Sequence, residues 1–297
     1  MINRSLAGLE TGFQYWKKNA PTNKSTIATS TTYEDYFGAV LQISTLNGEY
    51  EFRVFANDED GLIGYGDVQS FKVGGGSQQE YAVPEIVDLG LSVKWASFNL
   101  GATKPEEFGD YYAWGETEPY YEPGSAQSDA PLWKSGKEAG YDWPSYKWCM
   151  GSGNTMTKYC NDSSYGYNGF TDDKTVLDPE NDAAHVNLGG TWRMPTDAEW
   201  TELRNNCTWE WISLNGVCGR KVTSNMPGYT DKYIFLPAAG YRNFSGLDSA
   251  GSDAFYWSSA LVTDFPNCSW HVFFYSSNVY RSNYNRCYGQ SIRPVSE

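Results

Sequence analysis

The segment from Tyr256 to Val295 concentrates side chains that are suited to recognition by contact. Its forty residues include ten aromatics and seven serines, but no lysine and no glutamate. Tyrosine gives a large contact area at a low entropy cost, and serine and asparagine give adaptable hydrogen bonds. The chemistry that this composition favours is binding through aromatic contacts and neutral hydrogen bonds.

The order of residues in this segment predicts β-strands with one aromatic face. From Trp270 to Tyr275 the residues alternate at the period of a strand, with Trp270, Val272 and Phe274 on one side. If that side is core, the outward row is a histidine, a phenylalanine and a tyrosine, where a solvated strand would carry lysine, threonine or glutamate. Residues 280–285 repeat the alternation, with tyrosine and serine on one side and arginine and asparagine on the other. Either another part of the chain or a binding partner should cover the aromatic row.

Motifs for catalysis are not found in the sequence. It contains no GxSxG, P-loop or HExxH motif, and its six cysteines include no CxxC pair. Cys149 with Cys160 and Cys207 with Cys218 each lie eleven residues apart, a spacing that suits local disulfides in an exported protein. The alternative is that all six are reduced and act as small apolar side chains.

A group of acidic residues between 172 and 182 offers hard oxygen ligands of the kind that calcium prefers. Their spacing is not that of an EF-hand, which favours a solvated acidic loop over a calcium site. We therefore expect no cofactor, with calcium as the alternative.

Size and charge restrict the classes of partner. A chain of 297 residues, 40% hydrophobic and 16% aromatic, can form two globular domains. A net charge of -14 argues against nucleic acid and anionic membranes, because no basic stripe would neutralise phosphates. No apolar run approaches the roughly 18 residues of a spanning helix, so we expect no direct membrane insertion. The first residues lack the apolar core of a signal peptide. The protein is then intracellular, or its export signal was removed or lies upstream.

Residues 1–73 predict a small all-β sandwich. Alternation from Tyr50 to Ala56 and a second strand from about Gly66 to Val73 resemble the last hairpin of a fibronectin type III domain. The strands expected before Gly12 have little room, so we expect the chain to begin partway into that domain. Residues 74–82 form a Gly/Ser/Gln linker, and a second domain spans 83–297.

One helix is signalled in the second domain. Thr196 and Glu199 form a capping-box pattern, and Trp200 and Leu203 supply the apolar face of a short helix behind it. Most of the remaining domain is short β-like pieces punctuated by glycine and proline. This pattern predicts an irregular, loop-rich domain.

Four stretches in order resemble the C-type-lectin-like fold, in the branch shared with formylglycine-generating enzymes. They are WRMPTDAEW (192–200), FLPAAGYR (235–242), YWSS (256–259) and GQSIRPV (289–295). The resemblance implies an α+β fold with short helices. Within this group, residues 256–295 resemble the variable region of proteins that bacterial diversity-generating retroelements target, in which adenines of the template copy are randomised.

The resemblance implies a set of binding positions and a set of scaffold positions. Arg193 and Arg293 are expected to pair with acidic residues, and variation would make Cys268 and Cys287 free thiols. The ten implied binding positions, each reachable from an AAC codon by changing adenines, are Val262, Phe265, Cys268, His271, Phe273, Tyr275, Tyr280, Ser282, Tyr284 and Cys287. The implied scaffold residues are Arg193, Thr196, Glu199, Trp200, Trp257 and Arg293.

The implied function is non-enzymatic binding of a protein or glycan on another surface by an extracellular or cell-surface protein. One alternative is a structural surface or fimbrial subunit, whose aromatic row packs on a neighbouring subunit. A second is a copper oxidase similar to formylglycine-generating enzymes, with Cys268 and Cys287 as thiolate ligands. A third is a calcium-dependent sugar lectin, although the Glu-Pro-Asn, Gln-Pro-Asp and Trp-Asn-Asp triplets of that class are absent.

Overall fold

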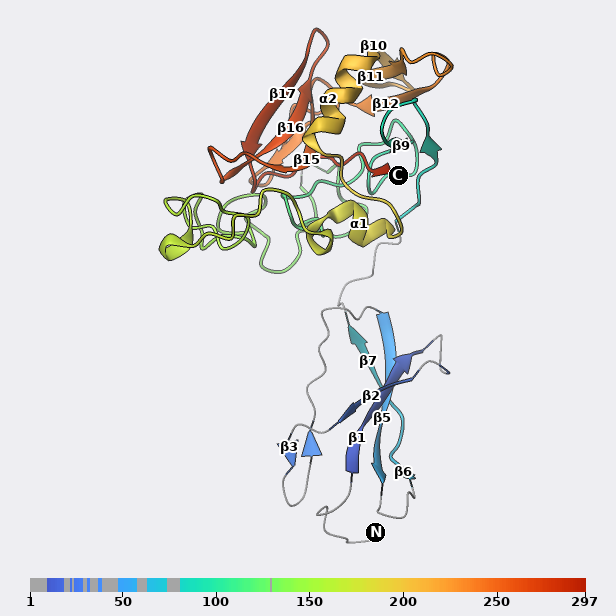
Figure 1. Ribbon diagram of the computed structural model, residues 1–297, viewed down its shortest axis with the longest axis vertical. Coiled ribbons are helices and arrows are strands. Elements are labelled where there is room, and N and C mark those ends of the chain that lie inside the picture. Colours follow the sequence, from blue (N-terminus) through green and yellow to red (C-terminus); the bar gives the residue numbers. More distant parts are fainter. Residues whose placement is uncertain are drawn as a thin grey trace. The chain divides into compact units, whose positions relative to one another are not determined.

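The computed structural model describes residues 10–18, 22, 24–28, 31–32, 37–38, 48–57, 63–73, 81–128 and 130–297 (Figure 1). The chain divides into two compact units, residues 1–79 and 80–297. This boundary lies within the predicted 74–82 linker, of which residues 74–80 lie outside the described part. Strands account for 38% of residues and helices for 9%, in agreement with a loop-rich α+β chain.

The described part of the first unit is all-β. The long strand β5 pairs with β1 along one edge and with both β6 and β7 along the other, while β1 also pairs with β2. The predicted alternation from Tyr50 to Ala56 lies within β5, and the predicted second strand appears as β7, which begins at Gln69. Its strands are β1 (Glu10–Lys17), β2 (Ser25–Ala28), β3 (Thr31–Thr32), β4 (Phe37–Gly38), β5 (Gly48–Asn57), β6 (Ile63–Tyr65) and β7 (Gln69–Val73).

The second unit contains small sheets joined by long turn-rich segments. Its sheets have the strand orders β8-β9-β18, β10-β11-β12, β13-β14 and β15-β16-β17. The pairing of β9 with β18 brings the beginning and the end of this unit together. The elements are β8 (Ile86–Val87), β9 (Lys94–Ala96), η1 (Tyr167–Gly169), η2 (Pro179–Asn181), α1 (Ala183–Leu188), α2 (Asp197–Asn206), β10 (Cys207–Leu214), β11 (Val217–Ser224), β12 (Tyr233–Pro237), β13 (Tyr241–Asn243), β14 (Gly246–Asp248), β15 (Ala254–Leu261), β16 (Cys268–Phe274), β17 (Val279–Asn285) and β18 (Val295–Ser296).

Helix α2 begins where its capping box predicts. The hydroxyl of Thr196 accepts a hydrogen bond from the Glu199 amide at 3.1 Å, and the Glu199 carboxylate accepts one from the Thr196 amide at 2.7 Å. These bonds satisfy two amide groups that the helix itself leaves without partners. The helix buries Trp200 and Leu203, and it contacts β15 and β16 (Figure 1).

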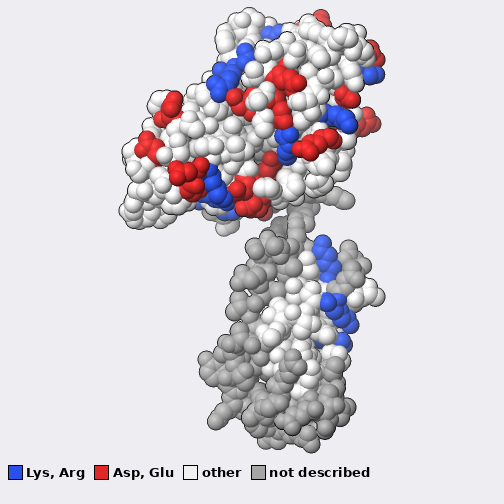
Figure 2. All heavy atoms as spheres, in the orientation of Figure 1, with Lys and Arg blue, Asp and Glu red and all other residues white. Residues whose placement is uncertain are grey.

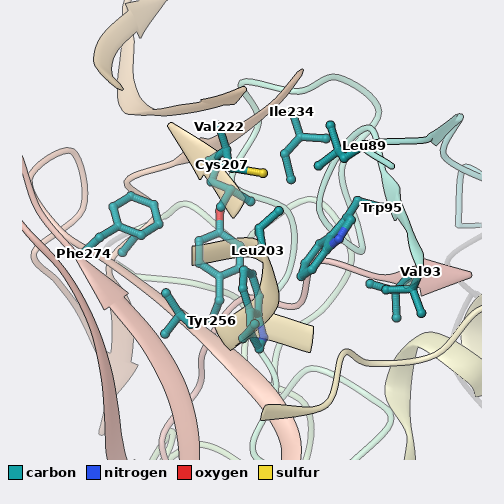
Figure 3. Close-up of a cluster of buried hydrophobic side chains, with 14 residues drawn as sticks. Leu89, Val93, Trp95, Leu203, Cys207, Val222, Ile234, Tyr256 and Phe274 are labelled. Carbon is teal, nitrogen blue, oxygen red and sulfur yellow. The ribbon is translucent and has the colours of Figure 1, made fainter. Parts of the chain in front are cut away.

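The largest apolar cluster fills the space between α2 and the sheets around it. Figure 3 shows Leu203 of α2 between Trp95 from β9 and Tyr256 from β15. Val272 and Phe274 of β16 belong to the same cluster and are almost fully buried. The prediction that these two residues face the core is therefore confirmed. The third residue of that row, Trp270, is half-buried.

The region from 100 to 190 is built largely from turns around a core of tyrosines. The guanidinium of Arg286, which follows β17, is fully buried in it. Its Nη1 donates to the carbonyls of Tyr159 and Pro266, both at 2.9 Å, and Nη2 donates to the carbonyl of Lys158 at 3.0 Å. Arg286 thereby anchors the end of β17 to the turn-rich region.

All six cysteines are free thiols. Cys207 lies opposite Ser224 at one end of the β10–β11 hairpin, whereas Cys218 lies opposite Ser213 near the other end. The two thiols lie toward opposite ends of the hairpin. The predicted disulfide between Cys207 and Cys218 is therefore wrong, and the alternative of reduced cysteines agrees with the structure.

The surface of the second unit carries charges of both signs. On the face that Figure 2 draws, Asp and Glu side chains lie interspersed with Lys and Arg over the described residues from 81 onward. Within the described ranges, no helix is long and apolar enough to cross a membrane.

Candidate binding site on the closing sheet

The register of the β15–β16–β17 sheet places the closing aromatics on one face. Phe273 of β16 lies opposite Phe255 of β15 and opposite Tyr280 of β17. Directly opposed residues in an antiparallel sheet share a face, and every second residue along a strand returns to it. Tyr275 and Tyr284 therefore belong to the same face as Phe273. The opposite face contacts α2 and carries Val272 and Phe274 into the core.

Six partly exposed rings form two groups of three, which together we call the aromatic platform: Phe273, Tyr275 and Tyr280 in one group, and Tyr241, Tyr284 and Tyr288 in the other. At one end Phe273 stacks on Tyr280 at 5.9 Å between ring centroids, and Tyr275 stacks on Tyr280 at 6.0 Å. At the other end Tyr284 contacts Tyr241 at 5.4 Å and Tyr288 at 4.9 Å. These separations lie in the range that aromatic pairs prefer.

Phe255 joins the two ends of the platform from below. Its ring lies 4.8 Å from that of Phe273, 6.0 Å from that of Tyr284 and 4.7 Å from that of Tyr241. Phe255 is 9% exposed, whereas Tyr280 is 42% exposed and the other platform rings are half-buried. Each platform ring thus has protein on one side and solvent on the other, which holds it in place without hiding it.

Five of the ten predicted binding positions come together on this face. They are Phe273, Tyr275, Tyr280, Ser282 and Tyr284, and Ser282 lies opposite His271 in the register. Phe265 is 53% exposed, but it lies in the turn before β16, at the end of that strand remote from Tyr275.

His271 has the strand parity of the platform but not its exposure. Its side chain is 2% exposed, and its Nδ1 lies 2.9 Å from the amide oxygen of Gln290. Burial lowers the pKa of His271 to about 4, so the imidazole is neutral at physiological pH. Trp257 and Tyr284 contact the ring from either side. The prediction that His271 contacts a ligand is wrong, because neighbouring rings cover it.

Three other predicted binding positions lie away from the platform surface. Val262 is 3% exposed and its amide donates to the carbonyl of Cys268, which closes the turn between β15 and β16. Cys287 is 1% exposed within the tyrosine-rich core. Cys268 is half-buried and has the parity of Trp270, on the face opposite the platform. Their assignment to the binding surface is corrected accordingly.

Two platform rings were not predicted. Tyr288 lies in the turn after β17, where strand alternation no longer indicates a direction. Tyr241 comes from β13, which two bridges hold beside the closing segment: Gly240 with Ala254 at the start of β15, and Arg242 with Gly289. The position of Tyr288 in the aromatic-rich segment could have indicated a binding role. Tyr241 lies in the FLPAAGYR stretch, which the resemblance assigns to the scaffold and not to the binding surface.

The predicted scaffold residues are buried or half-buried and join segments that are distant in the sequence. Arg193 makes a two-pronged ion pair with Glu199, at 2.6 and 2.9 Å, which confirms its predicted acidic partner. The indole N–H of Trp200 donates to the carbonyl of Trp257 at 3.1 Å. Trp257 is fully buried, and its own indole N–H donates to the carbonyl of Tyr112 at 2.8 Å.

Arg293 differs from its prediction. It is fully buried, and its guanidinium donates to neutral oxygens: the Asn99 amide at 2.9 Å and the carbonyls of Ala96 at 3.0 Å and Phe235 at 2.7 Å. Burial lowers its pKa to about 10, which still leaves it charged at pH 7. Arg293 therefore crosslinks three backbone segments through hydrogen bonds in place of the expected ion pair.

The four stretches that carried the resemblance meet around this scaffold, although they are far apart in the sequence. Each is joined to another by hydrogen bonds between buried or half-buried groups. The contacts are Arg193 with Val295 through both backbone groups, Trp200 with Trp257, Phe235 with Arg293, and Trp257 with Ser291.

The face opposite the platform is fastened to α2 at the edge strand. The Arg281 guanidinium of β17 lies over the Trp270 ring at 3.2 Å from the centroid, and its Nε donates to Asp197 of α2 at 2.7 Å. Val279, at the start of the same strand, packs against the large apolar cluster. Alternate residues of β17 therefore either fix the strand or belong to the platform face.

The acidic residues between 172 and 182 have other partners. Asp172 accepts from the amides of Tyr159 and Cys160, Asp178 pairs with Lys174 at 2.7 Å, and Asp182 caps α1. Over the ranges that the structure describes, no group of three or more His, Cys, Asp or Glu side chains could hold a metal ion.

The two thiols of the copper alternative are in surroundings that oppose ionisation. Burial raises the pKa of both Cys268 and Cys287. Metal ligation by cysteine uses the thiolate, so these positions do not favour a thiolate pair.

Known proteins provide no likeness to set beside this geometry. The chain matches no protein-family model, no curated protein and no solved structure.

Proposed function

We propose that this chain is a non-enzymatic ligand-binding protein, displayed at a cell surface or secreted, whose recognition site is the aromatic platform. The observation that carries the proposal is the platform itself: two groups of three partly exposed rings, joined through Phe255, four of which come from β16, β17 and the turn between them. Binding surfaces draw their energy from a few large, rigid aromatic side chains. Because the rings contact one another before binding, little side-chain freedom is lost when a ligand covers them.

The proposal includes a C-type-lectin-like fold for residues 83–297 and a fibronectin type III-like spacer before it. Support for the first comes from the meeting of the four resembling stretches around Arg293 and Trp257, and from the pairing of β9 with β18. Support for the second is the all-β pairing around β5.

The proposal also includes diversification of the platform by a retroelement. Five of the ten positions inferred from the resemblance share the platform face, whereas Trp200, Trp257 and Arg293 of the scaffold set are buried. A mechanism that changes the platform positions would alter ligand choice without altering the buried supports.

The sequence of the gene's neighbourhood tests this part directly. We expect a reverse transcriptase gene and a near-copy of the 256–295 coding region that differs at adenines. A neighbourhood without them would overturn diversification and leave the platform as an unchanging site.

Binding itself is tested on arrays of glycans and of purified surface proteins. The variant replaces Phe273, Tyr275, Tyr280 and Tyr284 with alanine. We expect the spots that the wild-type protein binds to lose at least about tenfold in affinity, since truncating a central aromatic typically costs more than 1 kcal/mol.

The matched control replaces Tyr167 and Tyr233, which are 43% and 50% exposed and lie outside the platform. It should bind as the wild-type protein does. Near-ultraviolet circular dichroism of both variants establishes that they are folded. Equal binding by the platform variant and the control would reject the platform as the site.

A structural subunit is the second candidate, and one observation favours it. Strand β17 pairs only with β16 among the described strands, so its outer edge has backbone groups available to a neighbouring chain. If the platform packs on a second subunit, sedimentation should show association that grows with concentration and is lost on replacing Tyr275 and Tyr280. A monomer at every concentration would reject this candidate.

A further inference from the structure

Two carboxylates lie at the rim of the aromatic platform. Asp248 of β14 is directly opposite Tyr241 of β13, so their side chains share a face. Asp253 immediately precedes Ala254, which is opposite Phe274, and it therefore falls beside Tyr275. Asp248 is exposed and Asp253 half-buried. One carboxylate is thus beside each end of the platform.

Both carboxylates act on the platform rings electrostatically. Burial raises the pKa of Tyr241, and the charge of Asp248 raises it further. The hydrogen bond to Tyr280 lowers the pKa of Tyr275, while the charge of Asp253 opposes that change. The ion pairs formed among the described residues include neither Asp248 nor Asp253. Their negative charge is therefore not balanced by a cation of the described part of the chain.

Elsewhere, the protein covers aromatic rings with its own cations. Arg281 lies over Trp270, Lys221 lies 4.6 Å above the Tyr233 centroid, and Lys137 lies 3.6 Å above that of Tyr120. No Lys or Arg of the described ranges covers a platform ring in this way. The ring faces of the platform, which carry negative electrostatic potential, are thus available to a cation from outside.

We propose that the platform binds a basic side chain, arginine or lysine, presented on the surface of a protein partner. This inference rests on the proposed function and specifies the chemistry of its ligand. A cationic group gains from the ring faces and from Asp248 and Asp253 together. A neutral glycan could stack on the rings and donate hydrogen bonds to the carboxylates, but it would gain no cation–π or charge–charge attraction. An anionic ligand would be repelled by both carboxylates.

The test is titration with N-acetyl-arginine amide against N-acetyl-citrulline amide, which has nearly the same shape without the charge. Binding is followed by NMR of protein labelled on the tyrosine rings. We expect the arginine compound to shift the Tyr275 and Tyr280 signals and to bind about tenfold more tightly than citrulline. Its affinity should fall with added salt, because the rim charges are solvent-accessible.

Three variants locate the effect. Asp253→Asn should weaken arginine binding several-fold, and replacing Tyr275 and Tyr280 with leucine should remove it. The matched control is Glu210→Gln, an exposed acidic residue on β10 that is not part of the platform, which should leave binding unchanged.

Each contrary result has a distinct meaning. Equal binding of citrulline, or equal competition by a neutral disaccharide, would overturn the cationic ligand while the array result still supports a platform that binds. No shift by the arginine compound, or shifts that survive the leucine substitutions, would also overturn it. The array experiment with the alanine variant tests whether the platform binds any ligand, whatever its charge. The proposed function is therefore tested independently of the cationic ligand.

Discussion

His271 is a buried neutral histidine in the middle of a row of partly exposed rings. Its Nδ1 contacts Gln290, whose own amide nitrogen has no partner among the described groups. A proton added to the imidazole would place a charge in this closed space with little compensation. The residue therefore supports the platform from beneath only while it remains neutral.

Acid should consequently weaken the fold through His271. Its ordinary pKa is 6.5 and its folded pKa is about 4, so between these values the unfolded chain holds a proton that the folded chain does not. The free energy of unfolding should fall by roughly 3 kcal/mol from pH 7 to pH 4, and this contribution should level off as the pH falls below the folded pKa. Urea unfolding at a series of pH values measures it.

His271→Asn supplies the control, because asparagine does not titrate in this range. The variant is expected to be less stable at pH 7 but to show a flatter dependence on pH between 4 and 7. Parallel curves for the two proteins would mean that His271 does not carry the acid sensitivity.

The sequence predicts which face of the closing sheet each side chain belongs to. It does not predict how deeply a side chain is buried within that face. Alternation alone separated Val272 and Phe274 from Phe273 and Tyr275. It could not distinguish His271 from Phe273, since both have the same parity and only the rings of Trp257 and Tyr284 decide which is covered. Depth depends on contacts with segments distant in the chain.

At the scale of elements, α2 shows how local signals can define a structure. The capping box and the apolar spacing of Trp200 and Leu203 lie within a few residues, so its position follows from the sequence. The β10–β11 hairpin was not predicted, although Asn215 and Gly216 offer the strongest short hairpin signal. Both residues have positive φ, 50° and 87°, as the tight turn between Leu214 and Val217 requires.

Removing the cap of α2 should cost stability without changing the site. Thr196→Ala deletes the hydroxyl that accepts from the Glu199 amide, and we expect a loss of about 1 kcal/mol in the free energy of unfolding. Thr201→Ala, within the same helix, is the matched control and should be nearly neutral. Chemical denaturation of both variants provides the comparison, and equal losses would show that the cap contributes nothing specific.

Over the whole molecule, the two units should fold independently. The second unit has its own apolar core, which includes Trp95 of β9, and its last strand, β18, pairs with β9 near its beginning. We expect a fragment of residues 80–297 to keep the near-ultraviolet dichroism and melting transition that this unit shows in the full chain.

A shorter fragment, residues 98–297, tests the role of the paired ends. It lacks β8 and β9, so it removes Trp95 and leaves β18 without its partner. This fragment should fail to give a cooperative melting transition. Loss of structure in the 80–297 fragment would instead show that the first unit is needed for folding.

The alternating faces of β16 and β17 also have a consequence for how related genes differ from one another. Codons for Phe273 and Tyr280 specify side chains at the platform, while their neighbours Phe274 and Arg281 specify supports. Aligned copies of this gene from different isolates should therefore show a substitution rate that rises and falls every second codon along both strands. This alternation of substitution rate should be interrupted at His271, because its side chain has the parity of the platform residues but is buried.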